Sequence, residues 1–170
     1  MQTTTVKLYA WRYDNARTYL AAALFVLGNL ALPQLFHLVP RGGIVWLPIY
    51  FFTLIGAYKY GWRVGLLTAV ASPVINSLLF GMPLAAALPA ITAKSVLLAL
   101  CAGWAAARFR KASLWMLLAV VLAYQSAGTL VEWALKGDFV LAAQDFRLGL
   151  PGMALQVLGG WFAINYLIRK

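Results

Sequence analysis

The sequence predicts an all-α integral membrane protein, a bundle of six transmembrane helices with both termini in the cytoplasm. Three observations support this fold class. Hydrophobic residues make up 64% of the 170 residues and charged residues only 11%, a composition that excludes a soluble domain of this size. Apolar segments of about twenty residues, the length that crosses the hydrocarbon core, recur along the chain. The cations collect in alternate gaps between these segments and at both termini.

Six apolar segments are long enough, or nearly long enough, to be transmembrane helices. The second is short, with Trp46 and Tyr58 near its ends, so we expect it to tilt little or to form an irregular pair with the third. The first sixteen residues mix aromatic and cationic side chains, which predicts a cytoplasmic segment along the membrane interface. No linker or repeat interrupts the chain, so residues 1–170 are expected to form a single membrane domain. The expected spans are approximately residues 17–39, 44–58, 61–80, 83–107, 113–135 and 148–168.

The distribution of positive charge predicts the orientation of the chain. Of the 14 Lys and Arg residues, ten precede the first segment, fill every second gap or lie at the C-terminus. Cytoplasmic loops carry an excess of Lys and Arg, so we expect these gaps and both termini to be cytoplasmic. The net charge of +10 is attributed to contact with the lipid bilayer and not to nucleic acid. The ten cations are Lys7, Arg12, Arg17, Lys59, Arg63, Arg108, Arg110, Lys111, Arg169 and Lys170.

Small residues recur at four-residue spacing in the third and fourth segments and at eight-residue spacing in the sixth. Such stripes let helix backbones approach closely. Packing within the bundle is the favoured interpretation, and docking of another membrane protein is the alternative. The stripes are Gly61, Gly65 and Ala69, then Ala99, Gly103 and Ala107, and then Gly152 and Gly160.

The sequence offers little material for catalysis or metal binding. It has no GxxxxGK[ST] phosphate loop, no GxSxG elbow and no HExxH helix, so we do not expect an enzyme with its own ATPase activity. A single Cys101 excludes an internal disulfide or a thiolate metal site. No catalytic residue, cofactor or metal is predicted. The few acidic residues are Asp14, Glu132, Asp138 and Asp145.

Lys94 is the one cation expected inside an apolar segment. If its helix starts at residue 83, Lys94 lies about 16 Å from the outer end, close to the bilayer centre. A Lys at that depth costs about 2.5–3.5 kcal/mol on insertion scales, so it should face the bundle interior or a wet cavity. The same arithmetic places Gln125 about 15 Å and Gln156 about 12 Å from the outer ends of their helices. We therefore expect these three side chains to meet in one plane.

Two interpretations of Lys94 stay open. In the first, a structural polar network joins Lys94 to Gln125, Gln156 or carbonyls freed near Pro89 and holds the helices together. In the second, Lys94 forms the base of an outward-opening pocket that receives an anionic group. The second is preferred because Glu132 lies too far along its helix to neutralise the ammonium. A deprotonated Lys94 would weaken the case for an anion.

Several short motifs occur in order between Leu35 and Arg108: LFH followed by a Gly pair and WLP, the turn GAYKYGW, SP and GMP. In order, spacing and location among the spans, they resemble the substrate-binding S components of energy-coupling factor (ECF) vitamin transporters. The resemblance implies a six-helix protein that captures a vitamin or related micronutrient outside the cell. A transmembrane T component and two ATPase subunits would energise its delivery, during which the S component topples in the membrane. The family's small-residue docking pattern on the first helix, matched by Ala21, Gly28 and Ala31, is interrupted by Leu24.

The expected cargo is a small vitamin-like molecule, with a carboxylate held by Lys94, as in pantothenate, lipoate, biotin or niacin. Its binding residues are expected near the outer end of the bundle. They are Lys94 at the base, Gln125 and Gln156 beside it, Asn76 and Glu132 at the entrance, Trp46 or Trp133 as an aromatic wall, and His37 and Arg41 in the first outer loop.

The alternative function is a non-transporting six-span membrane scaffold of the MreD type, which holds partners and needs no occupied pocket. A solitary facilitator or proton-coupled carrier is a third option, but the chain has few intramembrane carboxylates for a proton relay. Under each of these interpretations the protein is expected in the cytoplasmic membrane of a prokaryote.

Overall fold

The computed structural model describes residues 7–168. All regular secondary structure in this range is helical, and the range contains no β-strand. Within this range four helices are long and apolar enough to cross a membrane, which indicates a multi-pass membrane protein. They are α1 (Ala16–Phe36), α4 (Trp62–Phe80), α5 (Leu88–Phe109) and α6 (Leu114–Lys136).

Two further helical stretches are interrupted. Between α1 and α4 lie α2 (Gly42–Trp46), the 3₁₀ turn η1 (Pro48–Tyr50) and α3 (Phe51–Tyr60). After α6 come α7 (Phe139–Ala142), α8 (Gln144–Leu148), α9 (Leu150–Phe162) and a π-helical turn, η2 (Ala163–Leu167).

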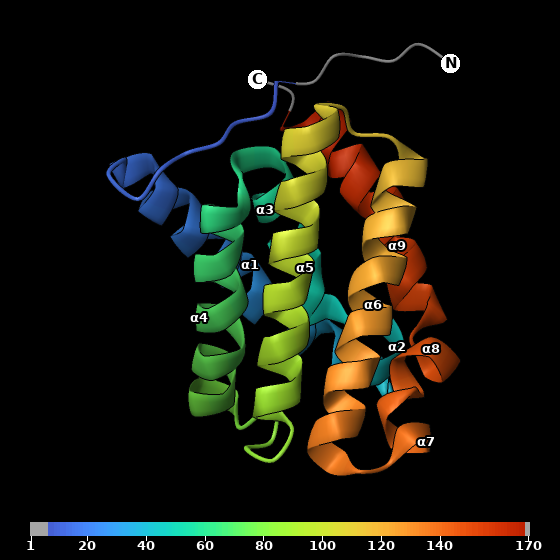
Figure 1. Cartoon of the computed structure of the whole chain (residues 1–170). Helices are drawn as coiled ribbons and strands as arrows, with labels where there is room; N and C mark the ends of the chain where they lie inside the picture. Colours follow the sequence, from blue (N-terminus) through green and yellow to red (C-terminus); the bar gives the residue numbers. More distant parts are fainter. Residues whose placement is uncertain (1–6, 169–170) are drawn as a thin grey trace.

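The helices form a bundle in which α5 lies between α4 and α6 (Figure 1). Behind them α3 packs against α4 and α5, α1 leans across α3 and α4, and α9 packs against α6. The core between these helices is made of large apolar and aromatic side chains that are fully buried, including Leu54, Tyr58, Leu98, Leu117, Val121 and Tyr124.

The second expected span is not one straight helix. Helix α2 ends at Trp46, Leu47 adopts a left-handed conformation with φ 47°, and Pro48, which has no N–H, opens η1. Asn29 of α1 supports the restart of the helix: it accepts a 3.2 Å hydrogen bond from the Phe52 N–H and donates one of 3.0 Å to Thr53 Oγ1. Irregular backbone at this point is therefore held by polar groups of neighbouring helices.

Helix α5 begins at Leu88 and not at residue 83, because residues 81–87 form a loop. Lys94 therefore lies only about 9 Å from the start of its helix, and Gln156 about 9 Å from the start of α9. Gln125 lies about 16 Å from the end of α6. Because these three helix ends lie on different elements, the expectation that the side chains share one depth stays a prediction.

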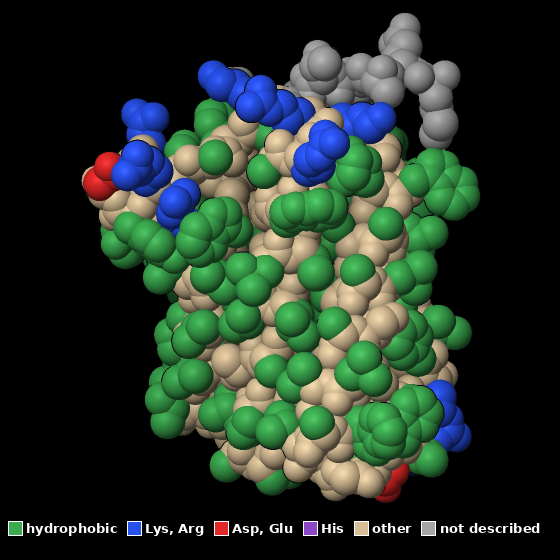
Figure 2. Space-filling model, in the orientation of Figure 1, with side chains coloured by type: hydrophobic (Ala, Val, Ile, Leu, Met, Phe, Trp, Pro, Cys, Tyr) green, Lys and Arg blue, Asp and Glu red, His purple; other side chains and the backbone are tan. Residues whose placement is uncertain are grey.

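Most Lys and Arg side chains gather at one end of the bundle, where α5 ends and α6 begins (Figures 1 and 2). We call this the cationic end and the opposite one, which carries α7 and α8, the far end. Part of the N-terminal segment lies across the cationic end, since the Tyr9 and Trp11 N–H groups donate to the carbonyls of Lys59 and Tyr60. Residues 1–6 of that segment lie outside the described residues, as do Arg169 and Lys170, the two C-terminal cations expected in the cytoplasm.

Apart from Ala107, which is exposed, the small-residue stripes pack inside the bundle, as the favoured interpretation predicted. A Cβ atom added at Gly65 would lie 2.4 Å from Ala57, and one added at Gly103 would lie 2.4 Å from Trp62. On α1, Gly28 faces Phe52 at 2.7 Å and Ala21 is buried. These two residues therefore do not form an exposed docking surface together with Ala31.

Candidate functional site

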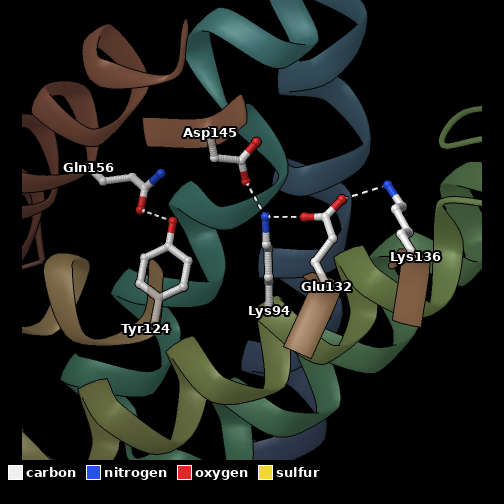
Figure 3. A network of polar contacts seen from close by, with 6 residues as sticks. All are labelled: Lys94, Tyr124, Glu132, Lys136, Asp145 and Gln156. Carbon is white, nitrogen blue, oxygen red and sulfur yellow. Dashed lines mark hydrogen bonds and ion pairs between the residues drawn. The ribbon is translucent and has the colours of Figure 1, made fainter. Parts of the chain in front are cut away.

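Lys94 is the buried centre of a chain of charges at the far end, whose outer member, Lys136, is exposed (Figure 3). Only 2% of the residue is exposed, and its Nζ lies 2.5 Å from Glu132 Oε2 and 2.7 Å from Asp145 Oδ2. The other oxygen of Glu132 lies 2.5 Å from Lys136 Nζ. We call these four residues, Lys94, Glu132, Lys136 and Asp145, the Lys94 network.

The expectation that Glu132 is too far from Lys94 was wrong. It assumed that α5 starts at residue 83, whereas the later start brings Lys94 within two turns of the far end, level with Glu132. Two ammonium groups and two carboxylates balance formally, so the ammonium of Lys94 is fully compensated. A buried charge is tolerated when it is paired in this way. The original reason for expecting an anionic ligand is therefore removed.

The backbone of α6 and the α7–α8 connection place these groups. The aliphatic stem of Lys94 lies against Gly128, where an added Cβ would be 2.5 Å from Lys94 Cγ. Asp138 caps α7 by accepting a 3.1 Å hydrogen bond from the Leu141 N–H, and the following turn brings Asp145 of α8 over Lys94. Burial raises the pKa of the Asp145 carboxyl, an effect that the facing Lys94 opposes without cancelling it.

A cavity of about 230 Å³ adjoins the network. We call it the polar cavity, because charged and polar groups converge on one part of its wall. Its other walls are apolar and come from α2, η1 and α5. The polar lining consists of Tyr50, Lys94, Glu132, Lys136, Gln144 and Asp145.

A polar stripe continues from the network into the bundle. It is formed by buried side chains of α5, α6 and α9, several of whose polar atoms have no hydrogen-bond partner among the described residues. Buried polar atoms of this kind usually contact water or a solute. Farther from the far end along α5 and α6 lie the fully buried apolar side chains of Leu98, Leu117 and Val121, which belong to the hydrophobic core. The unpartnered atoms belong to Ser95, Gln125, Thr129 and Gln156.

Of the predicted site residues, Lys94 and Glu132 are in direct contact. Gln125 and Gln156 are buried close beneath, but neither hydrogen-bonds Lys94; Gln156 Oε1 instead accepts a 2.8 Å hydrogen bond from the Tyr124 hydroxyl (Figure 3). The side-chain amides of Gln125 and Gln156 therefore belong to the polar stripe and do not contact the Lys94 ammonium. This differs from the structural network suggested by the sequence, in which these amides bonded Lys94.

The other predicted site residues lie elsewhere. Asn76 and His37 line a separate cavity beside α1, and Arg41 lines a surface hollow with Asp138 and Arg147. Trp46 stacks on Phe36 with ring centroids 5.3 Å apart, and Trp133 packs edge-on against Phe139 at 5.5 Å. Neither Trp is part of the lining of the polar cavity.

Sequence reasoning missed Asp145, Lys136 and Tyr50. Two signals pointed to the first pair: Lys136 follows Glu132 by four residues, the spacing of a helical ion pair, and Asp145 is one of only four acidic residues. Tyr50 carried no signal, because its position depends on the break at Leu47. Across the described chain, no cluster of three His, Cys, Asp or Glu side chains comes together as a metal site.

Comparisons of the chain with protein-family models, with curated proteins and with solved structures found no match. The resemblance to ECF S components therefore stays a prediction.

Proposed function

We propose that this protein is the substrate-capture component of an ECF-type importer, which binds a small vitamin-like molecule at the far end and delivers it inward with a T component and two ATPase subunits. The observation that carries the proposal is the Lys94 network beside a cavity of about 230 Å³. Ionisable groups at such depth mark a functional site by default, since their burial is costly.

The proposed topology has six passes, with the cationic end in the cytoplasm of a prokaryotic cell. The interrupted stretch α2–η1–α3 and the pair α9–η2 would supply the second and sixth passes. The gathering of Lys and Arg at one end supports this orientation. Broken helices that border a cavity are also typical of transporters, because freed backbone groups are tolerated only where protein or water covers them.

The apolar core beyond the polar stripe supports capture and argues against a channel. A solute held near Lys94 would meet the buried side chains of Leu98, Leu117 and Val121 on its way through the bundle. Passage would require these side chains to move aside or the whole protein to reorient. The chain has no ATPase motif of its own, so partner subunits would have to supply the energy for that movement.

The proposal is tested by native mass spectrometry of the protein purified from its own membranes in mild detergent. We expect a small-molecule adduct on the wild type, loss of that adduct in Lys94→Met, and its retention in Lys111→Met, a control at the cationic end. Thermal unfolding checks that both variants are folded. Co-purification of a T component and two ATPase subunits tests the transport part.

A scaffold gives the opposite result. If the folded wild type carries no small molecule while another membrane protein co-purifies without ATPase subunits, the protein is a scaffold of the MreD type and the transport proposal is wrong.

A further inference from the structure

A second cavity, of about 330 Å³, lies beside the polar cavity. We call it the apolar cavity, because most of its wall is aliphatic. It is lined by the end of α1, by α2, η1 and the loop before α5, and by single residues of α4 and α5. His37 and Asn76 add two polar groups at its edge. The aliphatic lining includes Pro33, Pro48, Ile49, Met82, Pro83 and Leu84.

The two cavities are neighbours that share part of their walls. Gly43, Ile44, Ile49 and Ile91 line both. Gly43 adds no side chain to this shared wall, and a Cβ added there would lie 3.1 Å from His37 Nε2. One elongated molecule can therefore occupy both, with its polar part beside Lys94 and its apolar part beside Pro33.

The charges around the polar cavity determine which net charge the polar group of a bound molecule can carry. The Lys94 network is balanced, so an added anion or cation would bring into the cavity a charge that has no partner there, which is costly. A group without net charge avoids this cost. The network also offers both kinds of hydrogen bond: Asp145 contacts Lys94 through Oδ2 and presents its other oxygen as an acceptor, while Lys136 has further N–H donors beyond the one directed at Glu132 (Figure 3).

We infer that the bound molecule is amphipathic, with an electroneutral head, zwitterionic or amide-like, in the polar cavity and an apolar body in the apolar cavity. This inference rests on the proposed function and names the class of its substrate. It replaces the carboxylate anion that the sequence alone suggested.

Four soluble probes with the same phenylethyl body test the head: L-phenylalanine (zwitterion), hydrocinnamamide (neutral), hydrocinnamate (anion) and phenethylamine (cation). Binding to the protein in lipid nanodiscs is measured by titration calorimetry. We expect L-phenylalanine or hydrocinnamamide to bind about tenfold more tightly than both singly charged probes. Glycine, which has the zwitterionic head without the body, should bind at least about tenfold more weakly than L-phenylalanine.

A pair of variants tests the body. Met82→Trp places a larger side chain in the apolar cavity. We expect it to lower the affinity for the tightest-binding phenylethyl probe about tenfold. Leu79→Trp is the matched control, since Leu79 is 65% exposed on α4 and lines neither cavity; it should leave binding unchanged.

Three results would overturn the inference: tightest binding by hydrocinnamate or phenethylamine, equal binding in Met82→Trp and wild type, or a retained native molecule that is singly charged, lacks an apolar part or is a phospholipid. A retained small solute of either of the first two kinds would leave the proposed function standing. A folded protein that retains no molecule and binds no probe would contradict both.

Discussion

The stem of Lys94 lies directly on the backbone of Gly128, the residue one turn before Glu132 on α6. We predict that Gly128→Ala destabilises the protein, because its Cβ would displace Lys94 from both carboxylates. Overpacking of this kind costs about 1–3 kcal/mol, which exceeds the gain of about 1 kcal/mol from replacing Gly in a helix. Thermal unfolding in detergent measures the effect, with Ser126→Ala on the exposed face of α6 as control. A higher melting temperature for Gly128→Ala would contradict the packing described.

Removal of the Lys94 ammonium should lower the free energy of unfolding more than removal of the Asp145 carboxylate. Lys94→Met leaves the Asp145 carboxylate buried without a positive partner, and we expect a loss of about 3 kcal/mol, at the lower end for a broken buried pair because Glu132 keeps Lys136. Adding Asp145→Asn to Lys94→Met should restore most of this loss, since no unpaired carboxylate remains. Chemical denaturation of both single variants and the double variant completes the cycle. Additive effects would show that the two groups do not interact.

The raised pKa of Asp145 predicts a pH dependence of stability. Between the ordinary Asp pKa of about 3.9 and the raised value, the folded protein holds a proton that the unfolded chain has released. The free energy of unfolding contributed by Asp145 therefore rises as the pH falls through the raised pKa. Wild type should gain stability relative to Asp145→Asn over this range in thermal unfolding. Parallel curves for wild type and Asp145→Asn would refute this.

Asn29 should be essential for the break between α2 and α3. Asn29→Leu removes the acceptor of the Phe52 N–H and the donor to Thr53 Oγ1 and Ser72 Oγ. Each buried group left without a partner costs about 1–3 kcal/mol, so the total loss should reach about 3 kcal/mol or more in chemical denaturation. Gln34→Leu, which removes one half-buried 3.3 Å bond to Asn76, is the control. A loss no larger than that of the control would contradict this role of Asn29.

The long helices could be predicted from the sequence because apolar length and flanking cations mark them directly. Helix α1 was expected over residues 17–39 and runs over Ala16–Phe36, and α6 was expected over 113–135 and runs over Leu114–Lys136. The start of α5 was missed because the loop before it contains Met82, Leu84 and Ala85. Hydropathy does not distinguish an apolar loop from an apolar helix.

The site was predicted only in part. The burial of Lys94 followed from its apolar surroundings, but its pairing did not, since the late start of α5 and the turn between α7 and α8 decide which carboxylates reach it. For a related reason the sequence did not show that Asn76 lines the cavity beside α1 and not the one beside Lys94. Helical spacing gives the face of one helix, whereas the neighbour of that face depends on how α1, η1 and α4 pack together.

The pairing of Lys94 has a consequence for biogenesis. The ribosome makes α5 before α6 and α8, so Lys94 emerges from it ahead of both carboxylate partners. An isolated Lys at that stage costs about 2.5–3.5 kcal/mol, and Glu132 arrives with the next helix to emerge. The hairpin of α5 and α6 is therefore the smallest nascent unit in which the ammonium is neutralised, and Asp145 joins it only after both helices have been inserted.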